Sequence, residues 1–222
     1  MRRAVTLALI LAAVLAVPSE APSDAAVATR PPFTFSIAPL DTATRQLMNG
    51  RSWRPGCPVP LRELRLVHVR FWGFDRHVHR GALVVRARYA RPIVRVFRRL
   101  YAVSYPIRRM RLVDRYGAND HASMAADNTS AFNCRWRAGI CCTWSQHAYG
   151  RALDINPVEN PYVFNGGFSP PAGRPFLDRS QHRPGMIHVH DRVWWAFRAI
   201  GWEWGGTWTT EHDYQHFSSN GR

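Results

Sequence analysis

Two short segments, far apart in the chain, carry the side chains that most constrain its fold. Residues 145–154 read SQHAYGRALD and contain His147 and Asp154, whereas residues 213–216 read DYQH. Imidazoles and carboxylates are ligands of Zn²⁺, and a catalytic zinc site uses three protein ligands and leaves one position for water. His147, Asp154 and His216 can therefore close around one ion if the fold brings them together, with Asp213 free to take a proton from that water.

The spacing between His147 and Asp154 constrains the local backbone. Two residues seven apart face opposite sides of a straight strand, whereas two helical turns would bring them to the same side. A helix is disfavoured here, because Gly150 costs a helix interior about 1 kcal/mol and Pro157 disfavours helical backbone just before it. We expect a bend at Gly150, followed by a short strand over residues 151–155 that presents Asp154.

The two segments resemble a known family. Ser-x-His-x-x-Gly-x-Ala-x-Asp followed by Asp-x-x-His is similar to the motif of the zinc D-alanyl-D-alanine carboxypeptidases and L-alanyl-D-glutamate endopeptidases, and most of all to the D-alanyl-D-alanine carboxypeptidase-like subgroup. The resemblance extends from about Gly56 to Phe217. It includes four further blocks, at residues 56–60, 123–130, 156–162 and 204–206.

The resemblance implies a zinc site and a general base. His147, Asp154 and His216 correspond to the zinc ligands of the family, and Asp213 corresponds to its general base. It also implies an α+β fold of the hedgehog/DD-peptidase-like type, with an antiparallel sheet bearing the zinc site and helices packed against it. The order of the elements that we expect from the sequence fits the same class.

Substrate-binding residues are implied before and within the motif. The family has a substrate-binding Arg a dozen or so residues before its first zinc-ligand His, which falls on Arg135 here. A guanidinium is permanently charged and grips a carboxylate or an oxyanion with two donors. The alternative is an ordinary surface arginine. Ser130 and Asp127 are further candidates for lining the cleft, and Ser145 is a candidate for orienting the loop or a ligand.

The chain begins with a segment typical of a secretory signal peptide. A basic start precedes an apolar run over residues 4–17, and an Ala-x-Ala site ends at Ala28, after which we expect cleavage. The alternative is an uncleaved anchor, but the run is short for a membrane span, which needs about 20 apolar residues. We expect no membrane span after cleavage and a secreted or cell-envelope location.

Two regions follow the predicted signal peptide. Residues 29–55 are rich in Pro, Thr, Ser and Arg and have weak periodicity, so we expect a partly ordered N-terminal leader. Residues 56–222 are long enough for one domain with a sizeable core, and we expect them to form the zinc peptidase domain.

The excess of basic residues indicates which class of partner the chain could bind. The 30 basic residues, all arginine, exceed the 15 acidic residues and give a formal net charge of +15. Such a charge favours polyanions. The arginines are scattered and no nucleic-acid-binding motif accompanies them, so we expect no nucleic acid partner. Anionic cell-envelope polymers are the better candidates for an exported chain, and the alternative is that the charge has no binding function.

Four cysteines in an exported chain indicate disulfides. Cys57 and Cys134 lie in segments that resemble shared blocks of the family, so this pair is our first choice. Cys141 and Cys142 are adjacent, and either could pair with Cys134 instead. A four-cysteine zinc site is the rival interpretation, but the chain has no Cys-x-x-Cys pair.

The remaining pattern predicts a few elements. Residues 61–69 and 81–85 read as a hairpin, residues 92–103 as a helix that begins at Pro92, and residues 110–113 as a strand. Residues 156–185 read as a long loop, residues 191–200 as a helix capped by Asp191, and residues 214–217 as a final strand. Histidine pairs at 77/79 and 188/190 are possible metal ligands but more often structural.

The function that we expect is hydrolysis of a peptide bond in the peptidoglycan stem peptide by an exported zinc metallopeptidase, with a peptidoglycan peptide or muropeptide as substrate. The sequence leaves open whether the bond is D-Ala-D-Ala or L-Ala-D-Glu. The alternative is a non-catalytic zinc-containing module of the same fold that binds cell wall. Asp213 argues against the alternative, because a binding module needs no base beside its zinc.

Overall fold

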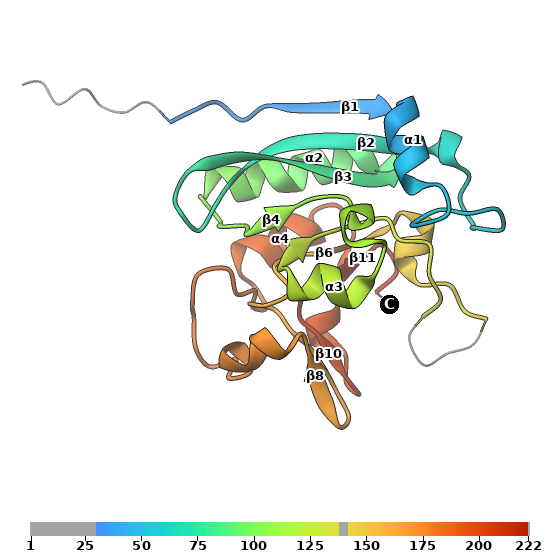
Figure 1. Ribbon diagram of the computed structural model, residues 1–222. Helices are drawn as coiled ribbons and strands as arrows, with labels where there is room; N and C mark the ends of the chain where they lie inside the picture. Colours follow the sequence, from blue (N-terminus) through green and yellow to red (C-terminus); the bar gives the residue numbers. More distant parts are fainter. Residues whose placement is uncertain (1–29, 138–141, 222) are drawn as a thin grey trace, which may run out of the picture. The chain divides into compact units, whose positions relative to one another are not determined.

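The longest strands form the predicted hairpin in the computed structural model, which describes residues 30–137 and 142–221. Strands β2 (Leu64–Trp72) and β3 (Val78–Arg86) pair antiparallel, from Leu64 opposite Arg86 to Trp72 opposite Val78. Strand β2 has the predicted length but lies three residues later, and β3 is longer than predicted. Together with β1 (Phe35–Pro39) they make a three-stranded sheet in the order β1-β2-β3, which spans the upper part of Figure 1.

The structure differs from the partly ordered leader that we expected over residues 29–55. Strand β1 pairs with β2 along its whole length, and helix α1 (Thr42–Met48) follows it. Asp41 caps α1 by accepting a hydrogen bond from the backbone N–H of Thr44 at 2.7 Å, and Met48 is fully buried. The weak periodicity was misleading because an edge strand is stabilised by its neighbour's backbone rather than by an apolar face of its own.

Helix α2 (Ala87–Ala102) begins earlier than predicted. It follows β3 directly, and Pro92 lies inside it rather than at its first turn. A proline inside a helix removes a backbone hydrogen bond and costs about 3 kcal/mol. The apolar stripe of α2 offsets this cost, because it extends back to Ala90 and is buried through Ile93 to Tyr101.

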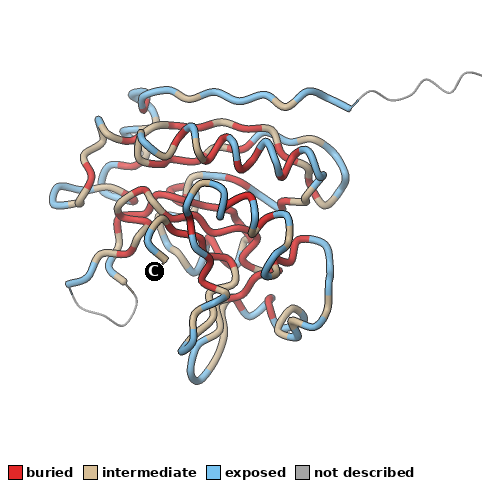
Figure 2. The backbone as a smooth tube through the Cα atoms, turned by 180° about the vertical axis from the view of Figure 1, so that it is seen from behind, coloured by how far each residue is buried: buried red, intermediate tan, exposed pale blue. Residues whose placement is uncertain are grey.

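Helix α2 lies between the large sheet and the C-terminal part of the fold. One side of it packs on β2 and the other on helix α4 (Arg192–Arg198), which Asp191 caps as predicted by accepting a hydrogen bond from the N–H of Trp194. The main core includes Val85, Phe97 and Phe217. Figure 2 shows buried residues along α2 and in the short strands beneath it.

The predicted disulfide between Cys57 and Cys134 is present. It adjoins a second, smaller core that includes Met48, Leu66 and Phe132. Cys141, one of the two cysteines that we considered as alternative partners of Cys134, lies outside the described residues, as does the predicted signal peptide.

Three small sheets complete the fold. Strands β6 (Ala152–Asp154), β11 (His216–Ser218) and β9 (Glu203–Trp204) form an antiparallel sheet in the order β6-β11-β9. A second antiparallel sheet has the order β10-β7-β8, from β10 (His212–Asp213), β7 (Tyr162–Phe164) and β8 (Gly167–Ser169), and projects at the bottom of Figure 1. Strands β4 (Arg109–Met110) and β5 (Asn128–Thr129) pair in parallel.

Two predictions for these regions were wrong. The expected long loop at residues 156–185 contains β7, β8 and the 3₁₀ helix η4 (Pro171–Phe176), and the strand expected at residues 110–113 ends at Met110. The other short helices are η1 (Leu61–Glu63), η2 (Val113–Tyr116), α3 (Asp120–Ala125), η3 (Gln146–Tyr149) and η5 (Gly205–Thr207). Strands of two or three residues have too few alternations to be recognised from a pattern.

The fold is α+β with several small antiparallel sheets, as the class prediction states. The more specific hedgehog/DD-peptidase-like fold stays a prediction. Over the described residues, no helix combines the length and the apolar character that crossing a bilayer requires.

Candidate metal centre

Strand pairing brings two of the predicted ligands together. Asp154 in β6 and His216 in β11 are directly paired residues of the antiparallel sheet, and both are buried, with 4% and 5% of their surface exposed. Opposed residues of an antiparallel pair project their side chains from the same face. The short strand predicted after Gly150 is therefore present and presents Asp154 as expected.

The third predicted ligand, His147, is positioned by a tight turn. It lies in the 3₁₀ helix η3, whose first N–H groups are capped by the Ser145 hydroxyl, which accepts a hydrogen bond from the N–H of His147 at 3.4 Å. The turn ends at Gly150, which has a left-handed φ of +61°. A Cβ atom at Gly150 would lie 2.6 Å from the backbone nitrogen of Arg86, so both conformation and space require glycine there.

The three side chains converge on one point. Nε2 of His147 lies 3.2 Å from Nδ1 of His216 and 3.2 Å from Oδ2 of Asp154, and Nδ1 of His216 lies 3.0 Å from Oδ1 of Asp154. Bonds of about 2.0–2.1 Å to zinc imply ligand atoms roughly 3.3 Å apart in a tetrahedron. The donor set and its spacing therefore fit Zn²⁺. Within the described part of the chain, these residues are the one group of three or more potential ligands.

The imidazole of His147 is oriented by a backbone carbonyl. Its Nδ1 lies 2.5 Å from the oxygen of Ala131, which makes Nδ1 the donor and leaves the lone pair of Nε2 for a metal. The residue before Ala131 also supports the site: Ser130 and Asp154 exchange two backbone hydrogen bonds, of 2.9 and 3.1 Å. The segment 130–131 thus holds two of the three ligands.

The electrostatics of the centre favour an ionised Asp154. Burial opposes its ionisation, but the imidazoles of His147 and His216 outweigh that effect and hold the pKa of Asp154 well below its usual range. Asp213 behaves differently. Its burial, together with the charge of Asp154 and against the opposing effect of His216, raises the pKa of Asp213 to about 7. Its Oδ1 is buried without a hydrogen-bond partner.

A cavity of about 920 Å³ opens onto the centre. Its lining includes all three ligands and Asp213, together with Arg135 and Ser145. Nη2 of Arg135 forms an ion pair with Asp120 at 2.7 Å, and its buried Nε has no hydrogen-bond partner. The structure therefore brings Arg135 and Asp213 to the same cavity as the ligands.

Two other candidates do not line the cavity. Ser130 is buried and contributes its backbone to Asp154 instead. Asp127 accepts a hydrogen bond from the N–H of Val158 at 3.0 Å and pairs with Arg108 at 3.5 Å. Both residues lie in the segment before the motif, whose backbone pairs with Asp154 at Ser130. Sequence spacing does not reveal this pairing.

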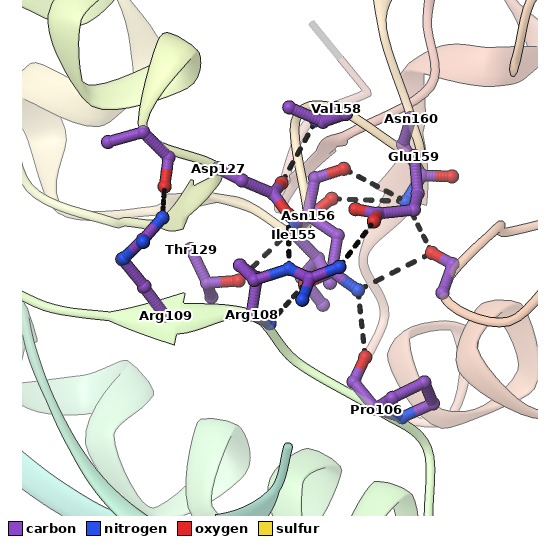
Figure 3. A network of polar contacts seen from close by, with 12 residues as sticks. Pro106, Arg108, Arg109, Asp127, Thr129, Ile155, Asn156, Val158, Glu159 and Asn160 are labelled. Carbon is purple, nitrogen blue, oxygen red and sulfur yellow. Dashed lines mark hydrogen bonds and ion pairs between the residues drawn. The ribbon is translucent and has the colours of Figure 1, made fainter. Parts of the chain in front are cut away.

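The segment after Asp154 is anchored by a buried polar network (Figure 3). Asn156 donates through its amide to the carbonyl oxygen of Pro106 at 2.8 Å and accepts at Oδ1 from the N–H of Arg108 at 3.1 Å. Glu159 lies 3.6 Å from the guanidinium of Arg108. Asn156 is fully buried with a left-handed φ of +44°, so the network fixes the chain immediately beyond the second ligand.

The cavity also contains residues that we did not predict. Glu211 accepts a hydrogen bond from the hydroxyl of Tyr162 and lies 3.4 Å from the guanidinium of Arg137. Glu211 could have been predicted from its spacing to Asp213, because residues two apart in an extended strand share one face.

The remaining histidine pairs are not part of the centre. His79 contacts the exposed Asp75 at 3.0 Å, and His188 packs on His182 with ring centroids 4.1 Å apart. Both contacts agree with the structural roles that we considered more frequent for such pairs.

Comparison with known families identifies the segment that carries the centre. Residues 142–219 match the family model described as D-alanyl-D-alanine carboxypeptidase. Searches of curated proteins and of solved structures give no match. The matched segment includes all three ligands and Asp213, and together with the buried His-Asp-His triad it indicates a metallopeptidase. Residues 142–219 of this chain are therefore similar to the D-alanyl-D-alanine carboxypeptidase family.

Proposed function

We propose that this protein is an exported zinc metallopeptidase that hydrolyses a peptide bond in the stem peptide of peptidoglycan. The observation that carries the proposal is the convergence, in one cavity, of three potential ligand atoms about 3 Å apart and of Asp213, whose buried Oδ1 has no hydrogen-bond partner. The ligands would be His147, Asp154 and His216. The family match adds the class of substrate, a peptide ending in or containing D-amino acids.

Zinc would supply Lewis-acid activation of a water molecule and of the scissile carbonyl. The chain's own residues do the rest. Asp154 remains ionised because two imidazoles flank it, and His147 offers the lone pair of Nε2 because its Nδ1 donates to Ala131. Three ligands of this kind leave one coordination position for the reacting groups.

Asp213 is the proposed general base. Its Oδ1 is buried in the cavity wall without a hydrogen-bond partner, so it can accept a proton from the attacking water and deliver that proton to the leaving amine. Burial raises the pKa of Asp213 to about 7, which suits proton transfer in both directions near neutral pH. A bound cation would favour the ionised carboxylate that the first step needs.

Arg135 is the proposed substrate-binding residue. Asp120 holds its guanidinium at one edge, whereas its buried Nε–H remains without a partner. A substrate carboxylate or the developing oxyanion would use that donor. Ser145 lies in the same lining and caps the turn that carries His147, so its proposed role is to keep that ligand in place.

The predicted signal peptide and the Cys57–Cys134 disulfide support export to an oxidising compartment. The net charge of +15 favours retention near anionic polymers of the cell envelope. We propose that residues 56–222 contain the zinc peptidase domain and that β1 and α1 complete it.

Digestion of purified muropeptides, read by mass spectrometry, tests the proposal. We expect zinc-dependent loss of a terminal D-Ala or cleavage between L-Ala and D-Glu, and the product masses identify the bond. A protein that holds zinc stoichiometrically but leaves every muropeptide intact would instead fit the non-catalytic cell-wall-binding module.

A further inference from the structure

The rim of the cavity carries a pair of stacked tryptophans that the proposed chemistry does not use. The rings of Trp136 and Trp144 are nearly parallel, with an interplanar angle of 19° and centroids 3.7 Å apart. Both residues line the same cavity as the metal centre. Trp144 packs against the smaller core, whereas Trp136 is the outer ring and is 44% exposed.

Backbone contacts position the segment that carries the outer ring. Trp136 and Trp144 are bridged as antiparallel neighbours, and the N–H of Arg137 donates to the oxygen of Thr143 at 2.8 Å. The segment is also tethered at its start, because Cys134 is disulfide-bonded to Cys57. A fixed aromatic face loses little conformational entropy when a ligand covers it.

Polar groups line the same cavity as this aromatic pair. Arg137 and Glu211 form an ion pair in the lining, and Arg135 precedes Trp136 directly. A purely apolar ligand would desolvate this ion pair and offer no hydrogen bond in return, at a cost in binding free energy. A pyranose ring suits the combination, since its C–H face stacks on the negative face of an indole while its hydroxyl and acetamido groups make hydrogen bonds at the edges.

We propose that Trp136, supported by Trp144, is a binding platform for an N-acetylated sugar ring, so that the cavity takes the stem peptide together with the glycan to which it is attached. The inference rests on the proposed function for the identity of the sugar. It makes the protein selective for stem peptides that are still linked to the disaccharide of peptidoglycan over free stem peptides.

Exposure alone does not distinguish Trp136. Trp195 is more exposed, at 56%, and also packs on aromatic neighbours, Trp194 and His190. Trp195 lies in α4 and is not part of the cavity lining. It therefore provides a matched control in which the same substitution removes an exposed indole away from the proposed sugar site.

Direct binding tests the platform without any hydrolysis. The purified protein would be titrated with the disaccharide N-acetylglucosaminyl-N-acetylmuramic acid, by calorimetry and by tryptophan fluorescence. We expect Trp136→Ala to weaken binding about tenfold, Trp136→Phe to retain most of the affinity, and Trp195→Ala to match the wild type. Equal melting temperatures would show that Trp136→Ala still folds. Absence of wild-type binding, equal binding by Trp136→Ala, or preference for a short single-stranded oligonucleotide would each overturn the inference.

Hydrolysis separates this inference from the proposed function. The ratio of kcat/KM for a disaccharide-linked stem peptide to that for the free stem peptide should be about ten in the wild type and should approach one in Trp136→Ala. Equal cleavage of both substrates by the wild type would overturn the sugar platform and leave the peptidase standing. Disaccharide binding that depends on Trp136, without cleavage of either substrate, would do the reverse.

Discussion

Asp154 and His216 are directly opposed residues of the antiparallel strands β6 and β11, with Oδ1 of the first 3.0 Å from Nδ1 of the second. The candidate metal centre therefore depends on the register of two short strands. A slip of one residue would turn one of the two side chains to the other face of the sheet. The ladder that Ser130 adds on the far side of Asp154 fixes that register further.

Removal of Asp154 should abolish metal binding. Its carboxylate lies within 3.2 Å of both imidazoles, and Asp154→Ala leaves only two ligands, too few for a zinc site. We expect about one zinc ion per wild-type chain and almost none in the variant, measured by elemental analysis after dialysis. Asp75→Ala, which removes an exposed carboxylate beside His79, should keep its zinc. Equal zinc in Asp154→Ala and wild type would place the metal elsewhere.

Replacement of the proposed base should separate catalysis from metal binding. Asp213→Asn keeps the shape of the side chain but cannot accept the proton, so we expect kcat to fall by about 10²- to 10⁴-fold. The zinc content should not change, because the three ligands remain in place. The measurement is muropeptide turnover alongside elemental analysis. Undiminished turnover in this variant would remove Asp213 from the mechanism.

Removal of the Arg135 side chain should weaken substrate recognition. A charged hydrogen bond contributes about 1.5–3 kcal/mol, so Arg135→Ala should lower kcat/KM by roughly ten- to a hundredfold. Arg135→Lys should recover only part of this, because an ammonium lacks the planar pair of donors. Arg95→Lys, on the exposed face of α2, is the control and should match the wild type. Full activity of Arg135→Ala would show that Arg135 does not bind the substrate.

Loss of the disulfide should destabilise the domain. Cys57 and Cys134 are separated by 77 positions in the sequence, and Cys134 is almost completely buried. Removal of such a bond typically costs about 2–5 kcal/mol of unfolding free energy. The double variant Cys57→Ser/Cys134→Ser should therefore unfold at a lower urea concentration than the wild type. Circular dichroism measures the unfolding transition. An unchanged midpoint would mean that the smaller core holds this segment without the bond.

Glu159 should make stability fall as pH rises. Burial and the neighbouring Asp127 raise the pKa of Glu159 from 4.5 to about 8. Below pH 4.5 the side chain is protonated in the folded and the unfolded chain alike. Between pH 4.5 and 8 the unfolded chain releases the proton while the folded protein keeps it, so the stability contribution is lost across that window.

Urea unfolding at several pH values from 5 to 9 measures this effect. Glu159→Gln imitates the protonated side chain at every pH, so the stability of the variant relative to the wild type should increase as pH rises. The two curves would run parallel if the ionisation of Glu159 were unchanged by folding.

The local chemistry of the centre was predictable from the sequence, because each feature depends on near neighbours. Gly150 marked the bend by its position between His147 and Asp154, and the φ of +61° confirms it. Asp191 was predictable as a helix cap for the same reason, since its side chain bonds to Trp194 three residues later.

Features that depend on distant contacts were not predictable in this way. The sequence predicts a helix start at Pro92 because nothing in its own neighbourhood shows that Ala90 is buried in the main core. Ser130 was expected in the cleft, but its backbone pairs with Asp154, and only the tertiary structure reveals that pairing. The short strands β7 and β8 were missed because their hydrogen bonds, and not an apolar pattern, hold them in place.

The carbonyl of Ala131 that orients His147 lies upstream of residues 142–219, the part that matches the family. A truncated chain limited to the matched residues would retain every ligand yet lack the acceptor that selects the tautomer of the first one, and the ladder partner of Asp154. The smallest portion worth excising or grafting into another scaffold therefore starts well before residue 142 and includes Ser130 and Ala131.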